Sequence, residues 1–131
     1  MALACTLMAS CGKCDAPILF PKENFQTTVD GKEVSIYTLR SGDITMQVTN
    51  FGARVVSLWT PDRDGNYDDI VLGYNNIENY INNPGERFLG AVVGPYANRI
   101  ANGTYTIGSE VYNFPQNNNG QTLHGGLKGL D

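Results

Sequence analysis

Short extended runs separated by turn residues make up most of the chain and constrain its fold more than any other feature. The stretch FQTTVDGKEVSIYTLR holds two such runs joined by Asp30-Gly31, a dipeptide that strongly indicates a β-hairpin. The stretch DITMQVTN alternates Ile44, Met46 and Val48 with polar residues, which is the period of a half-buried strand. We therefore expect an all-β protein.

The rest of the pattern adds strands and one short helix. Strands are expected in ARVVSLWT, DIVLGY and GAVVG, and a second hairpin in GTYTIGSEVYNF turns at Gly108-Ser109. The segment NNIENYINNPGERF is the helix-like piece, and it ends at Pro84-Gly85. Many short strands with frequent turns favour a sandwich or a barrel. We assign these aromatic side chains to its core: Phe51, Trp59, Tyr105, Tyr112 and Phe114.

Charge and cysteine content exclude several classes of function. The 131 residues carry 9 Lys and Arg against 13 Asp and Glu, and the basic residues are scattered, so a nucleic-acid partner is not expected. Cys5, Cys11 and Cys14 precede the β pattern, which leaves the remainder without a disulfide or a cysteine zinc site. The acidic stretch PDRDGNYDD does not have EF-hand spacing, so we expect a solvated turn there and no metal.

The first residues differ from the rest of the chain. MALACTLMASCGKC opens with an apolar run that reaches small residues just before Cys11, and this resembles the lipobox of a bacterial lipoprotein signal. The resemblance implies a leader and linker over residues 1–24, lipidation of Cys11, membrane anchoring through that lipid, and a location in the cell envelope or periplasm. The alternative is an ordinary N-terminus on a cytoplasmic protein.

Four later stretches carry a resemblance to a known family. NFGARVVSLWTPDRDG, DIVLGYNNIENY, GAVVGPYANRIANGTYTIGSEVYNF and NNNGQTLHGGLKGLD occur in the order found in the N-terminal portion of the aldose 1-epimerase (galactose mutarotase) family. ANRIANG and LHGG together are specific to that family. The resemblance implies an all-β fold, the antiparallel β-supersandwich of galactose mutarotases, of which residues 25–131 would form the N-terminal part.

The resemblance also implies an activity. Family members are isomerases that interconvert the α and β anomers of free hexoses such as galactose and glucose, with an aldohexose as the small-molecule partner and no cofactor. Their catalytic glutamate base and a second histidine lie further along the chain than residue 131, so we expect this chain alone to be inactive. The alternative function is a non-catalytic carbohydrate-binding domain of the same fold.

The candidate site has three residues. The resemblance places Asn98, Arg99 and His124 in the sugar pocket, with His124 as the catalytic candidate that positions and polarises the sugar. Arg supplies a rigid fork of donors, Asn both donates and accepts, and His switches between the two, so all three suit a rim of hydroxyls. Each has a plainer alternative: a surface histidine, an arginine paired with an acid, and a left-handed turn residue.

Two further features could contribute to sugar binding. Gly125 and Gly126 flank the histidine, and the absence of a Cβ would let a bulky sugar approach the backbone there. Trp59 and the seven tyrosines could form a platform on which sugar rings stack, although aromatic side chains that alternate in strands are more often core.

Overall fold

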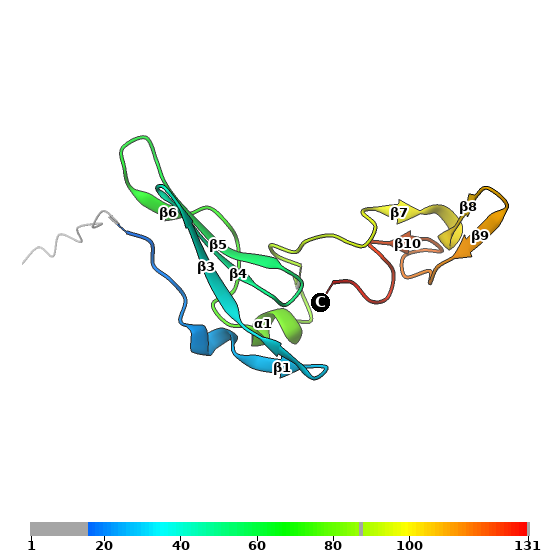
Figure 1. The fold of residues 1–131 in the computed structure, drawn as a ribbon, viewed down its shortest axis with the longest axis horizontal. Helices are drawn as coiled ribbons and strands as arrows, with labels where there is room; N and C mark the ends of the chain where they lie inside the picture. Colours follow the sequence, from blue (N-terminus) through cyan, green and yellow to red (C-terminus); the bar gives the residue numbers. More distant parts are fainter. Residues whose placement is uncertain (1–15, 87, 131) are drawn as a thin grey trace, which may run out of the picture.

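A computed structural model describes residues 16–86 and 88–130, and in it the chain forms two connected parts (Figure 1). The first part is a four-stranded antiparallel sheet with order β3-β4-β5-β6. Its strands are β3 (Ile36–Ser41), β4 (Ile44–Thr49), β5 (Arg54–Pro61) and β6 (Tyr67–Asp69). The cysteines, including the lipidation site expected at Cys11, lie outside the described residues. The all-β expectation is confirmed.

The hairpin predicted at Asp30-Gly31 is present. Strands β1 (Thr27–Val29) and β2 (Lys32–Val34) pair antiparallel around Asp30 and Gly31, whose φ angles of 50° and 76° are those of a tight hairpin turn. The expected second run is divided, because β2 ends at Val34 and β3 begins at Ile36 in a different sheet. The chain therefore changes sheet at Ser35.

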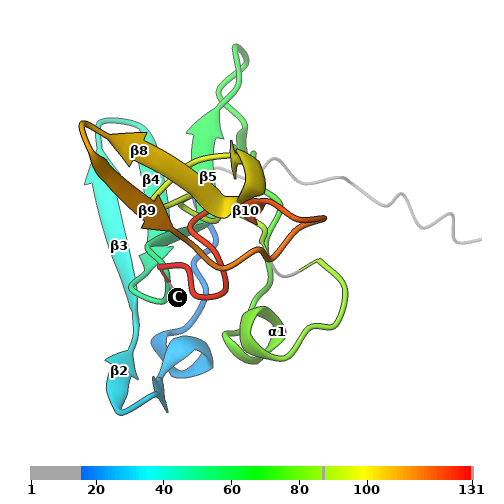
Figure 2. The same cartoon turned by 90° about the vertical axis from the view of Figure 1, so that its right-hand side faces the viewer.

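The helices are short. They are the 3-10 turns η1 (Lys22–Phe25) and η2 (Ala101–Gly103) and the helix α1 (Glu78–Ile81), which confirms the expected helical piece. α1 lies beside η1 (Figure 2), joined to it by a hydrogen bond of 2.9 Å from the Ile77 amide to the Asn24 carbonyl. Within residues 16–86 and 88–130, none of these helices has the length and apolarity needed to cross a membrane.

The core lies between the sheet and this pair of helical turns. Its buried members are Phe25, Val34, Ile36, Phe51, Val56, Ile77 and Tyr80. Arg54 is also buried, at 1% exposure, with its guanidinium carbon 5.1 Å from the Phe51 ring centre and 5.5 Å from that of Tyr80. A guanidinium over aromatic faces is stabilised by the ring quadrupoles. Arg54 therefore joins β5 to α1.

Strand β4 buries its polar side, the reverse of the expected orientation. Thr45, Gln47 and Thr49 are at most 6% exposed, whereas Ile44 is 47% exposed. Gln47 accepts from the Phe20 amide at 2.8 Å and donates to the Phe20 carbonyl at 3.1 Å, and Thr49 donates to the Ser35 carbonyl at 2.9 Å. Polar groups can be buried when they are hydrogen-bonded in this way. Part of the expected linker thus packs on the sheet.

The second part of the molecule is built from late, short strands. They are β7 (Arg99–Ile100), β8 (Thr104–Ile107), β9 (Glu110–Asn113) and β10 (Thr122–Leu123). β8 pairs with β9 and β10 pairs with β7, so the hairpin expected at Gly108-Ser109 is confirmed. Figure 1 shows this part extending away from the four-stranded sheet.

Two expected strands do not form. DIVLGY contributes only its first residue to β6, and GAVVG is irregular, with Leu72 80%, Val92 49% and Val93 48% exposed. A strand needs a partner for its backbone groups. Residues 90–94 receive one backbone bond from the main sheet, from the Val55 amide to the Gly90 carbonyl at 3.0 Å. The prediction of strands in these two segments was therefore wrong, because residues rich in β propensity still need a partner strand.

The aromatic core assignment holds only in part. Phe51 is buried at 8% exposure, which confirms its assignment, and Trp59 and Phe114 are half-buried. Tyr105 and Tyr112 are 39% and 43% exposed, so their assignment to the core was wrong. The Tyr105 ring stacks on those of Tyr112 and Phe114 at 5.3 Å in each case, on a two-stranded hairpin that is too thin to bury either face by itself.

Tyr80 offers a test of this core. Its hydroxyl accepts the Tyr74 amide at 2.8 Å, and burial raises the pKa of the Tyr80 phenol above its ordinary value of 10.0. The Tyr80→Phe variant should lose about 1–3 kcal/mol of unfolding free energy at pH 7, because it leaves the Tyr74 amide unsatisfied.

The pH dependence has a definite sign. Because the pKa of Tyr80 is raised in the folded state, its contribution is fully present below about pH 10 and is lost as pH rises through the folded value. Urea unfolding followed by circular dichroism should show a smaller alkaline loss of stability in Tyr80→Phe than in the wild type. Equal urea midpoints at pH 7 would contradict the hydrogen-bond assignment.

Candidate functional site

Strands β7 and β10 bring the candidate residues together. In their two-residue antiparallel ladder Ile100 lies opposite Thr122 and Arg99 opposite Leu123. The ladder continues through two hydrogen bonds between residues 26 positions apart in the chain. The His124 amide donates to the Asn98 carbonyl at 3.0 Å, and the Asn98 amide donates to His124 Nδ1 at 3.1 Å.

Both members of this pair adopt left-handed backbone conformations. The φ angle is 64° at Asn98 and 51° at His124. Asparagine and histidine are among the few non-glycine residues enriched in this region, and strain of this kind is found where the surrounding structure fixes it. The backbone of Asn98 therefore has the left-handed conformation that the turn-residue alternative predicted. The turn at His124 is what brings its imidazole back onto the Asn98 amide.

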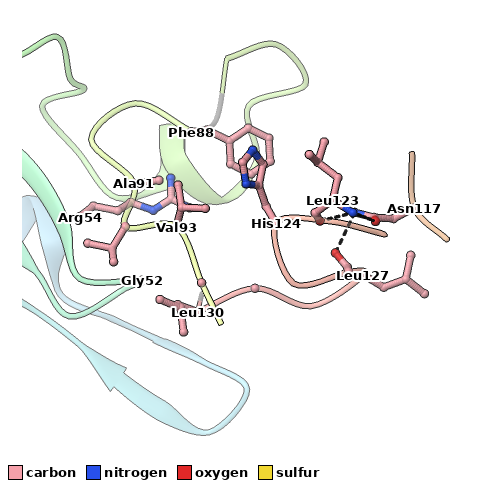
Figure 3. A pocket seen from close by; sticks show the side chains of 14 residues that line it. Gly52, Arg54, Phe88, Ala91, Val93, Asn117, Leu123, His124, Leu127 and Leu130 are labelled. Atoms are coloured by element: carbon pink, nitrogen blue, oxygen red, sulfur yellow. Dashed lines mark hydrogen bonds between the residues drawn. The ribbon is translucent and has the colours of Figure 1, made fainter. Parts of the chain in front are cut away.

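The Asn98 amide selects one form of the imidazole. Because Nδ1 accepts this hydrogen bond, the neutral ring carries its proton on Nε2, which makes Nε2 a donor. His124 is exposed and lines a cavity of about 450 Å³, shared with Arg54, Phe88 and Leu130 (Figure 3). The ring can thus offer an N–H to a polar group of a ligand.

Arg99 completes a hydrogen-bonded trio. Its Nη1 donates to Asn98 Oδ1 at 3.1 Å, and its Nε donates to Asn118 Oδ1 at 3.1 Å. These two bonds use two of the five donors of a guanidinium. Arg99 is exposed, and both of these partners are amide oxygens, whereas the plainer alternative expected an acid.

The trio borders two hollows. His124 lines the 450 Å³ cavity, which lies between β5 and the loop that follows β10, whereas Arg99 lines a second, more open hollow with Tyr96 and Tyr105. Asn98 lies between them through its bonds to both side chains. The described residues therefore link the three groups but do not enclose them in a single cavity.

Two asparagines that the sequence interpretation missed hold the trio in place. Asn117 Oδ1 accepts the Leu123 amide at 2.7 Å. Its Nδ2 donates to the carbonyls of Leu123 and Gly126 at 3.0 and 2.9 Å (Figure 3). Asn118 binds Arg99, as described above. The signal was the run NNNG before TLHGG, because an asparagine amide can replace the backbone partner of a neighbouring segment.

Position 125 requires a glycine because of its backbone conformation and its close neighbours. Its φ is 90°, and a Cβ there would lie 2.5 Å from Pro95 Cδ and 2.7 Å from the Gly94 carbonyl oxygen. At Gly126, with φ 98°, a Cβ would meet only ordinary contacts. The backbone that closely approaches Gly125 in this structure is therefore that of residues 94–95.

The acidic loop is a turn, as expected. Asp62 Oδ1 accepts the amides of Asp64 and Asn66 at 2.8 and 2.9 Å, which closes the loop on itself. Across residues 16–86 and 88–130, His, Cys, Asp and Glu side chains do not gather in groups of three or more that could hold a metal ion.

The role of Asn117 can be tested directly. Asn117→Ala removes three hydrogen bonds to the loop that carries His124, so the amides of residues 123–126 should exchange with solvent faster. Asn113→Ala, an exposed asparagine on β9, is the matched control. Amide hydrogen exchange followed by NMR is the measurement, and unchanged protection of residues 123–126 in Asn117→Ala would show that the loop is held by other contacts.

Comparison with known proteins gives a consistent result. The family model described as aldose 1-epimerase matches residues 35–131. A probable aldose 1-epimerase from Arthroderma benhamiae is 41% identical over 102 residues, which are 75% of this chain and 23% of that protein. The galactose mutarotase of Mus musculus is 39% identical over 101 residues, 77% of this chain and 29% of that protein.

A solved structure agrees with these sequences. The aldose epimerase homologue from C. elegans superposes with a TM-score of 0.65 at 32% identity, covering 74% of this chain and 30% of that one. The chain thus spans about a quarter of the length of the curated relatives it matches.

Proposed function

The chain belongs to the aldose 1-epimerase family, and on this premise we propose that its active form interconverts the α and β anomers of a free aldohexose such as galactose or glucose. The observation that supports this most is the Asn98–His124 pairing, which turns an imidazole N–H toward a cavity beside an arginine. Such a set of directional donors suits a neutral ring with many hydroxyls.

The chemistry is a balanced proton exchange. The anomeric hydroxyl gives its proton to a base, the ring oxygen receives a proton from an acid, and the bond between the anomeric carbon and the ring oxygen breaks to give the open aldehyde. Rotation about the next carbon–carbon bond and reclosure then produce the other anomer. General acid and base groups each contribute typically about 10²–10⁴-fold to such a step.

We assign His124 to positioning and polarising the sugar. With Nδ1 held by the Asn98 amide, its Nε2–H donates to a ring or hydroxyl oxygen and stabilises the charge that develops there. Arg99 supplies the guanidinium donors left over from its two amide bonds, and Asn98 supplies its Nδ2 group. These residues hold the sugar in one orientation, which is what fixes the faces on which acid and base must act.

The general base and the general acid of the reaction are not assigned to residues of this chain. The 131 residues contain a single histidine. We propose that the glutamate base and a second histidine come from the part of the family fold that this chain does not match. A non-catalytic carbohydrate-binding domain with the same pocket is the second candidate.

The site assignment can be tested in a chimera in which residues 16–131 replace the N-terminal part of Mus musculus galactose mutarotase. Arg99→Ala and His124→Ala should each lose a hydrogen bond worth about 1–3 kcal/mol in the transition state, or about 5- to 150-fold in kcat/KM. Arg63→Ala, in the exposed loop after β5, is the control for removal of an arginine. A coupled assay measures β-sugar formed from fresh α-sugar, and unchanged efficiency in both variants would reject the assignment.

The chain by itself should be inactive. It carries His124 but not the group proposed to act on the opposite face of the sugar, so polarimetry on fresh α-galactose with micromolar chain should give the buffer rate. A rate well above buffer that His124→Ala abolishes would show that residues 1–131 contain both the acid and the base.

A further inference from the structure

The side of the main sheet that faces away from η1 and α1 is a continuous apolar surface. Leu39, Met46 and Leu58 lie side by side across β3, β4 and β5, and Tyr37, Val48 and Val55 form the next row. Tyr37 and Leu39 are 53% and 52% exposed. We call this surface the outer face; it consists of Tyr37, Leu39, Ile44, Met46, Val48, Val55 and Leu58.

The opposite side of the sheet is already occupied. There Gln47 holds the Phe20 backbone through two hydrogen bonds, Thr49 holds Ser35, and the aromatic core packs beneath them. A sheet with one side in water normally turns its apolar side chains inward. Strand β4 buries its polar side chains and turns Ile44, Met46 and Val48 outward, which is the composition of a strand that is covered on both sides.

We propose that the outer face docks a second apolar β layer, supplied by the part of the aldose 1-epimerase fold that this chain does not match. The seven residues of the outer face carry no charge, so the partner that fits them is an apolar layer packed about 10 Å away. The length of such a partner is available in the relatives, because the matched part is only 30% of the C. elegans structure. The proposal requires the family fold and does not depend on any catalytic activity.

A charge placed on the outer face should have opposite effects in two contexts. Leu39→Glu or Met46→Glu in the 131-residue chain puts a carboxylate in water, so soluble yield should stay the same or rise. In the chimera with the mouse mutarotase the same carboxylate would be buried without a partner, and the soluble yield should fall by about tenfold or more. Thr28→Glu, on an exposed position of β1, is the matched control and should be neutral in both.

The results of these experiments distinguish a docked β layer from an ordinary surface and from a second copy of the chain. Glutamate at Leu39 and Met46 tolerated in the chimera as well as in the isolated chain would overturn the proposal, because the outer face would then be ordinary surface. A discrete dimer of the isolated chain in light scattering, made monomeric by Leu39→Glu while the chimera is unaffected, would also overturn it and assign the face to a second copy. Because solubility and mass are the readouts, a chimera without mutarotase activity still tests the docking.

Discussion

The pair of hydrogen bonds between Asn98 and His124 is the constraint on which the candidate site depends. Each bond joins segments 26 residues apart, and together they fix two left-handed residues at the end of one short ladder. A backbone amide aimed at Nδ1 determines which imidazole nitrogen carries the proton, so the electronic state of the ring follows from backbone geometry. Asn117, Asn118 and Gly125 have their roles because they maintain this arrangement.

The main sheet contributes the opposite wall of the His124 cavity. Arg54 lies over Phe51 and Tyr80, which couples β5 to α1, and it also borders the cavity. The irregular segment that leads to the second part of the molecule is tied to β5 through Val55 and Gly90. A cation buried between aromatic rings is costly to move, so this wall is a rigid reference against which the histidine loop is placed.

Local turn chemistry made part of this structure predictable. Asp30-Gly31 and Gly108-Ser109 encode their hairpins within a few residues, and both hairpins are present. The strands expected at residues 69–74 and 90–94 failed because pairing depends on neighbours that composition does not reveal. The orientation of β4 failed for a similar reason, since its polar side is stabilised by the distant Phe20 backbone. Asn98, Arg99 and His124, which the family motifs singled out, are neighbours joined by hydrogen bonds, while the asparagines that support them had only a weak sequence signal.

The tautomer of His124 tests the central claim most directly, and the single histidine of the chain makes the measurement simple. Nitrogen-15 NMR of the imidazole at neutral pH should show an unprotonated Nδ1 and a protonated Nε2, and added galactose should shift the Nε2 resonance. A ring protonated on Nδ1, or a galactose titration that leaves both nitrogens unchanged, would contradict the account of His124 as a fixed donor to the sugar.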